Sequence, residues 1–219
     1  MIIFWDFDGV IKDSVQIKSK AFGNLFAQFG NKISKRVIEH HESNGGMSRF
    51  EKIPIYLGWS GVRVTPELIE EYLNKFSILV KSKVIESDWV PGVLEVMQNK
   101  KINQLWFIVT ATPQDEIEEI INHLELNAFF QKIIGAPIMK SDAIKSILQS
   151  FSFEANDAIM IGDSISDYQA AVKNNVTFIL RKTTLNKGLQ KKLDCIMIDD
   201  FLDNCWDSFN QNSNLDILL

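Results

Sequence analysis

Long apolar runs, an excess of basic residues and abundant cysteine are all missing from this chain of 219 residues. No apolar run approaches the roughly 20 residues that a membrane-spanning helix needs, so we expect no membrane partner. The N-terminal apolar run is short and meets Asp6 at once, which does not fit a secretory signal peptide. The only cysteines, Cys195 and Cys205, fit a reduced cytoplasmic protein better than a disulfide scaffold.

Charge and motif content exclude further classes. The net charge of −5 argues against a nucleic-acid partner, which usually demands a basic face. We find no Walker-type phosphate loop and no pattern of a Ser–His–Asp triad. The pair His40 and His41 lacks other zinc ligands nearby, so we expect a packed or solvated helix face there.

The first thirteen residues organise the rest of the chain. Ile2–Trp5 is a short apolar run and predicts a buried strand. Asp6 and Asp8 follow it, and a period of two points both carboxylates the same way. Gly9 then allows a sharp turn. Paired like charges need a cation or a shared proton, so this pattern suggests a metal site with a carboxylate nucleophile beside an acid/base. The alternative is an ordinary strand end with turn aspartates.

The remaining chain divides into two kinds of segment. Residues 15–86 have helical spacing throughout and carry no strand signal. From about residue 88 apolar strands alternate with helices, which is typical of a parallel sheet built from crossover units. The first strand belongs to that sheet, because it has no other partner. We therefore predict an α/β core of residues 1–14 and 87–219 with an all-helical cap inserted at 15–86.

Polar residues follow several predicted strands at the edge where an open parallel sheet binds ligands. They are Asp6, Asp8, Thr110, Lys140, Asp163 and Asp167. Taken singly, the later four have ordinary explanations: a strand end, a solvated lysine, a helix cap and a first-turn acid. Their coincidence at one edge favours a functional site.

The order of these motifs resembles the haloacid dehalogenase-like hydrolase superfamily. DFDGV, a later Thr at a strand end, an isolated Lys and then GDSISD resemble its phosphatase branch with a helical cap after strand one, as in phosphoglycolate phosphatases and β-phosphoglucomutases. The resemblance covers essentially the whole chain. The first and last motifs are specific, whereas the Thr and the Lys alone are weak. The resemblance implies a Rossmann-like parallel sheet core and Mg²⁺ as cofactor.

Each matching residue then has an expected role. Asp6 is the nucleophile that forms an aspartyl-phosphate, and Asp8 protonates the leaving alcohol and later deprotonates water. Thr110 and the backbone N–H of Ala111 bind the phosphoryl group, and Lys140 offsets its charge.

Mg²⁺ prefers oxygen ligands, which Asp6, Asp163 and the Asp8 backbone carbonyl would supply. We place Asp167 at the metal site too, where it orders a metal-bound water or Lys140.

The cap selects the leaving group. Residues 44–49 resemble the cap segment that meets substrate in β-phosphoglucomutase-like members. Gly46 allows close approach, Arg49 is a candidate clamp for a second anionic group, and Lys52 lies one helical turn on. The mutases carry a His where this chain has Lys18, which favours hydrolysis.

The sequence thus predicts a cytoplasmic, Mg²⁺-dependent phosphatase of a small phosphorylated metabolite, either a sugar phosphate or a phosphoglycolate-like ester, acting as a monomer or weak homodimer. A sugar-phosphate mutase and a non-catalytic phosphate-binding member remain alternatives. A dehalogenase is disfavoured, because it has no use for Asp8 or Mg²⁺. The physiological substrate does not follow from these residues.

Overall fold

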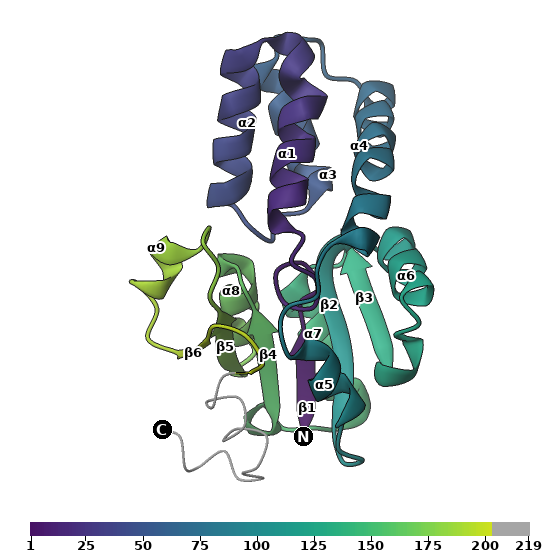
Figure 1. Cartoon of the computed structure of the whole chain (residues 1–219), viewed down its shortest axis with the longest axis vertical. Coiled ribbons are helices and arrows are strands. Elements are labelled where there is room, and N and C mark those ends of the chain that lie inside the picture. The colour runs from purple at the N-terminus through teal and green to yellow at the C-terminus, as the bar shows by residue number, and fades with distance from the viewer. Residues whose placement is uncertain (203–219) are drawn as a thin grey trace.

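A six-stranded, wholly parallel sheet forms the base of the molecule in the computed structural model, which describes residues 1–202 (Figure 1). The spatial order is β3-β2-β1-β4-β5-β6, so the first strand lies in the middle. The strands are β1 (Ile2–Trp5), β2 (Leu105–Pro113), β3 (Lys132–Ala136), β4 (Ala158–Gly162), β5 (Thr177–Arg181) and β6 (Ile196–Ile198). The chain runs from β1 to β2 on one side and resumes at β4 on the other, which creates a switch point at β1.

Strand β1 is apolar along its whole length because both faces of the sheet are covered. Ile3 and Trp5 join one buried cluster, which continues into the inserted helices. Ile2 and Phe4 join the other, which packs beneath α7 and α8. All four side chains are at most 1% exposed.

Residues 15–86 form helices only, and Figure 1 shows them as a layer above one end of the sheet. They are α1 (Val15–Phe26), α2 (Asn31–Ser43), α3 (Arg49–Trp59) and α4 (Pro66–Glu86), with a short 3₁₀ turn at Ala27–Phe29. The Thr65 hydroxyl caps α4 by accepting from the Leu68 N–H, and Pro66 occupies the first turn. The α/β fold with an inserted helical cap is confirmed, whereas the domain boundaries at 14/15 and 86/87 stay a prediction.

Helices cross over between the strands of the sheet. They are α5 (Val93–Gln98), α6 (Gln114–His123), α7 (Lys140–Phe151), α8 (Ile165–Lys173) and α9 (Lys187–Gln190), with 3₁₀ turns at Asn127–Phe129 and Ala155–Asp157. Helix α6 contacts α4, so the cap rests partly on this crossover. No helix of the described chain is long and apolar enough to cross a membrane. Cys195 is a free thiol, and Cys205 lies outside the described residues.

Strand β2 is longer than the apolar run Leu105–Val109 indicates. It continues through Thr110 to Pro113, and its pairing with β3 changes register between Val109 and Pro113. Thr110 is therefore not the last residue of the strand, because the polar residues that end the apolar run remain extended. This extension brings Thr112 to the same edge as the end of β1.

Candidate active site

Two carboxylates meet where β1 and its neighbour β4 end. Asp6 directly follows β1, and Asp163 directly follows β4. Carboxylate oxygens of Asp6, Asp163 and Asp167 all lie within 4.8 Å of one another. The turn after Asp6 is tight: Gly9 has a φ of +77°, and a Cβ there would lie 2.4 Å from Asp163 Oδ2. Only glycine fits that position, so the turn and the carboxylate cluster depend on each other.

The cluster concentrates more negative charge than a buried site normally tolerates. Burial, and next the charge of Asp167, raise the pKa of Asp6 to about 7 even though Lys140 opposes the shift. Burial and the charge of Asp6 also raise the pKa of Asp163 well above its usual value. Grouped carboxylate oxygens are the donors that a hard divalent cation takes, and such a cation would relieve this repulsion. The donor set therefore fits Mg²⁺.

Lys140 is the positive partner inside the cluster. Its Nζ lies 2.8 Å from Asp6 Oδ2 and donates to Asp167 Oδ1 at 2.5 Å. Burial lowers its pKa, but the two carboxylates outweigh burial and keep the ammonium charged. Asp167 Oδ2 accepts from the N–H and the hydroxyl of Ser164, at 3.1 and 2.6 Å. Asp167 thus ties Lys140 to the start of α8.

Asp8 is held by three donors from three segments. The Lys18 ammonium, on the first turn of α1, forms an ion pair with Asp8 Oδ2. Thr112 Oγ1 donates to the same oxygen at 3.0 Å, and Ser14 Oγ donates to Oδ1 at 2.6 Å. Burial raises the pKa of Asp8, but Lys18 and these hydroxyls outweigh it, and the net shift is downward. The second carboxylate therefore differs in environment from Asp6.

A small cavity of about 80 Å³ lies between these carboxylates and the helical layer. Thr110 and Ala111 line its floor with Asp6, Asp8 and Asp163. The cavity has room for a phosphoryl group beside the carboxylates.

Gly46 and Lys52 form part of the cavity's cap side. Gly46 has a φ of +78°, and a Cβ there would meet Ser166 Oγ at 1.9 Å, so the cap loop lies directly on the start of α8. Lys52 is 1% exposed, and its Nζ lies 3.0 Å from His41 Nδ1. Within the described chain no carboxylate comes within ion-pair distance of Lys52. Burial and then Lys18 lower the pKa of Lys52 to about 7.

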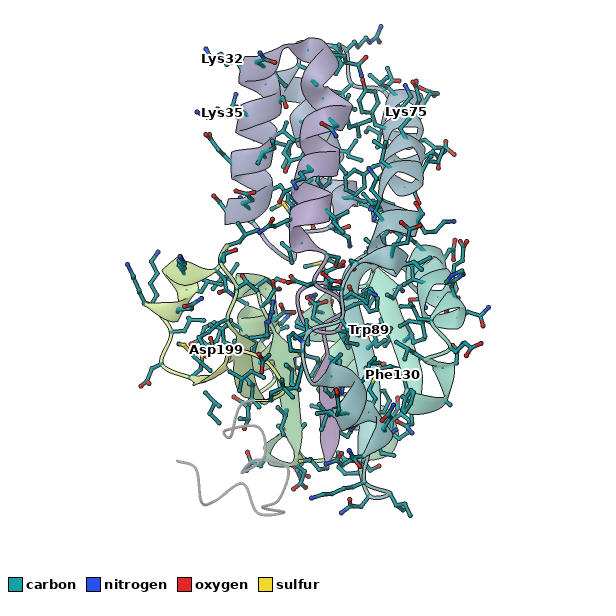
Figure 2. All side chains as sticks on the ribbon, in the orientation of Figure 1. Lys32, Lys35, Lys75, Trp89, Phe130 and Asp199 are labelled. Carbon is teal, nitrogen blue, oxygen red and sulfur yellow. The ribbon has the colours of Figure 1, made fainter. Side chains whose placement is uncertain are left out.

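Arg49 lines the cavity but is already paired, which the sequence did not indicate. Its guanidinium donates to both carboxylate oxygens of Glu116 on α6, at 2.7 and 2.5 Å. By contrast, Lys32, Lys35 and Lys75 project from the outer surface of the helical layer, away from the cavity (Figure 2). Lys52 and Lys18 are therefore the lysines that the cap contributes to the cavity wall.

The structure brings together every residue predicted for the site, and it adds four for which we predicted no role there: Ser14, His41, Thr112 and Glu116. It also places Lys18, compared above only with the His of the mutases, against Asp8. Thr112 had a usable signal, because it lies two residues after Thr110 on an extended segment. His41 was expected on a packed or solvated face, and it is packed against Lys52 at the cavity. Glu116 had no signal, because its partner Arg49 lies 67 residues away.

Comparison with known proteins identifies the type of fold and site. A model of the haloacid dehalogenase-like hydrolase family matches residues 2–181. A phosphoglycolate phosphatase from Pseudomonas savastanoi pv. phaseolicola is 26% identical over 209 residues, which cover 91% of this chain and 76% of that protein. A 5'-nucleotidase from Pseudomonas aeruginosa is 26% identical over 184 residues, which cover 81% of this chain and 80% of the relative.

A solved structure has the same arrangement of sheet and helices. CbbY from Rhodobacter sphaeroides, in complex with phosphate, superposes with a TM-score of 0.71 at 15% identity. The superposition covers 94% of this chain and 98% of CbbY. At this identity the likeness establishes the fold alone, so any assignment of substrate has to come from the site.

Proposed function

The chain belongs to the haloacid dehalogenase-like hydrolase family, and we propose that it is a Mg²⁺-dependent phosphatase of a small phosphorylated metabolite that reacts through Asp6. The observation that carries this proposal is the buried set of Asp6, Lys140 and Asp163 at the ends of adjacent strands. The relatives named phosphoglycolate phosphatase and 5'-nucleotidase support phosphate monoesters as the substrate class.

Asp6 is the nucleophile in this proposal. The Phe7 N–H donates to Asp6 Oδ1 at 2.7 Å and Lys140 lies against Oδ2, so the carboxylate is held at the cavity floor. A carboxylate oxygen attacks phosphorus, the bond to the leaving oxygen breaks, and an aspartyl-phosphate forms. The Thr110 hydroxyl and the backbone N–H of Ala111 donate hydrogen bonds to the phosphoryl oxygens.

Asp8 transfers protons in both half-reactions. It donates a proton to the leaving alcohol and then takes one from the water that hydrolyses the aspartyl-phosphate. Lys18, Thr112 and Ser14 hold the Asp8 carboxylate at the edge of the cavity. Their contacts stabilise its ionised form, which the second half-reaction needs, whereas the first half-reaction starts from the protonated form.

Asp6, Asp163 and the backbone carbonyl of Asp8 would hold Mg²⁺. When bound, the cation offsets the repulsion between a phosphate dianion and a carboxylate. Asp167 lies within the cluster, but its oxygens already accept from Lys140 and Ser164. We therefore expect Asp167 to position Lys140 and not to bind the metal directly.

The cap side points to a small leaving group that carries its own negative charge. Lys52 is the cavity cation without a carboxylate partner in the described chain, and a carboxylate on the substrate would supply one. A phosphoglycolate-like ester is small and carries that charge. A sugar-phosphate mutase remains the second candidate, because the cavity adjoins a pocket of about 420 Å³ that shares Gly46, Thr110 and Ala111 with it.

The test is phosphate release from a panel of phosphoglycolate, a hexose 1-phosphate, a nucleoside monophosphate and an aryl phosphate, with Mg²⁺ and with chelator. We expect release that needs Mg²⁺ and that is fastest with phosphoglycolate. Conversion of the hexose 1-phosphate to its 6-phosphate without release would support the mutase, and no reaction with any compound would refute an enzymatic role. A cytoplasmic location and a monomer or weak homodimer remain predictions.

A further inference from the structure

The ion pair between Arg49 and Glu116 joins the helical cap to the core beside the cavity. Arg49 opens α3 in the cap, whereas Glu116 lies in the first turn of α6, which leaves the sheet after β2. Arg49 is 5% exposed and Glu116 is 6% exposed. The geometry is bidentate, and the Ser77 hydroxyl of α4 donates to Glu116 as a third contact. Removing either ion would leave the other charge buried and unpaired, so the two side chains hold each other in place.

This pair separates two cavities. Arg49 lines the inner cavity of about 80 Å³ above the carboxylates. It also lines an outer pocket of about 280 Å³, together with Glu116, Ser77 and residues of α4 and α6. Glu116 lines the outer pocket but not the inner one. The guanidinium and its carboxylate partner therefore form the partition between the two spaces.

Packing holds Arg49 in this partition. Its guanidinium lies over the ring of Phe76, 4.6 Å from the ring centroid, and Phe76 stacks on Phe22. Both rings also line the inner cavity. A substrate anion that took over the two Arg49 hydrogen bonds now made to Glu116 would leave that buried carboxylate with a single hydroxyl donor, an unfavourable exchange.

We propose that Glu116 is a specificity-determining residue: by occupying Arg49 it closes the inner cavity on the side of the outer pocket and excludes substrates whose leaving group carries a second phosphate. The inference rests on the proposed function and deepens it, because it names the leaving groups that the same site would reject. Lys52 remains available for a short anionic leaving group, while Arg49 is neutralised. Neutralising Glu116 should free Arg49 and open the inner cavity towards the outer pocket.

A binding experiment tests this without turnover. In an Asp6→Asn background with Mg²⁺, calorimetry would measure the affinity for a hexose bisphosphate and for phosphoglycolate, with and without Glu116→Gln. We expect Glu116→Gln to tighten the bisphosphate about tenfold, the effect of one released charge-assisted hydrogen bond, and to leave phosphoglycolate within about threefold. Glu118→Gln is the matched control, because Glu118 is exposed on the same helix, lines neither of the two cavities and should change neither affinity.

Adding Arg49→Met to Glu116→Gln should cancel the gain, because the freed guanidinium is then absent. An unchanged bisphosphate affinity in Glu116→Gln, or an equal gain without Arg49, would overturn the inference and leave the pair as a structural link. If Glu116→Gln does not fold, Glu116→Asp, which loosens the bidentate fit, should give a smaller shift in the same direction, and no shift would again overturn it. Absence of phosphate release by the unmodified enzyme would count against the proposed function alone, since the binding result decides the role of Glu116.

Discussion

Replacing Lys52 by methionine should stabilise the folded protein at neutral pH while damaging its selectivity. Lys52 is 1% exposed, and its Nζ contacts the nitrogen of a buried histidine, not a carboxylate. The pKa of that histidine, His41, lies well below its usual value because of burial and then Lys52. Methionine keeps the length and apolar stem of lysine and removes the charge, so it leaves little empty volume.

The magnitude follows from the pKa of Lys52. Burial and Lys18 lower it from 10.5 to about 7. At about 1.4 kcal/mol for each pH unit, this difference makes buried Lys52 cost about 5 kcal/mol of stability below pH 7. Between pH 7 and 10.5 the unfolded chain binds the proton that the folded chain has lost, so the free energy of unfolding rises with pH and the cost disappears. The advantage of Lys52→Met should therefore shrink over that interval.

The assay is urea denaturation of the metal-free protein at pH 6 and pH 9.5. We expect Lys52→Met to raise the free energy of unfolding by several kcal/mol at pH 6 and by about 1 to 2 kcal/mol at pH 9.5. Lys32→Met is the control, because Lys32 is exposed on the outer surface of α2 and should change stability little at either pH (Figure 2). In parallel, kcat/KM for phosphoglycolate should fall relative to that for an aryl phosphate, about tenfold or more.

Two results would refute this reasoning. If Lys52→Met destabilises the protein at pH 6, the lysine is a favourable structural contact and not a retained binding group. If its gain is equal at both pH values, the ammonium is not deprotonated in the folded state at high pH. A loss of activity that is the same for both substrates would show that Lys52 does not contact the leaving group.

Three further changes test other parts of the site. Asp6→Asn should abolish turnover with the circular dichroism spectrum unchanged, and activity above about 1% of the unmodified enzyme would exclude Asp6 as nucleophile. Mg²⁺ should raise the thermal midpoint of the protein, since it binds the folded carboxylate cluster, and an equal rise in Asp163→Asn would argue against a site there. Gly46→Ala should cost more stability than Gly61→Ala in parallel urea titrations: the φ of the two glycines is similar, at +78° and +73°, but only the Cβ at Gly46 meets Ser166, whereas space around Gly61 is open. Equal losses, each about 1 to 2 kcal/mol, would mean that backbone strain alone acts at Gly46.

Local sequence patterns were sufficient for the fold and for the carboxylates. The run Ile2–Trp5 is apolar at every position because the sheet is covered on both faces, and that feature is readable without coordinates. Asp6 and Asp163 each follow such a run directly, so their place at the sheet edge depends only on where a strand ends. Parallel pairing then brings the two strand ends together.

The length of strand β2 was harder to predict from the sequence than its existence. The apolar run of β2 ends at Val109, yet the backbone stays extended to Pro113. The backbone stays extended although the pairing with β3 shifts register between Val109 and Pro113, and this extension places Thr112 beside Asp8.

The partners of Arg49 and Lys18 depended wholly on the tertiary structure. Arg49 has the residue type and position of an anion clamp, but α6 brings Glu116 to it from 67 residues away. Thr112 reaches Lys18 across 94 residues. Apolar periodicity records which face of each element is buried, because burial acts on every residue of that face. An ion pair instead depends on two atoms that meet only after the layers have packed, and neither residue carries a local trace of the other.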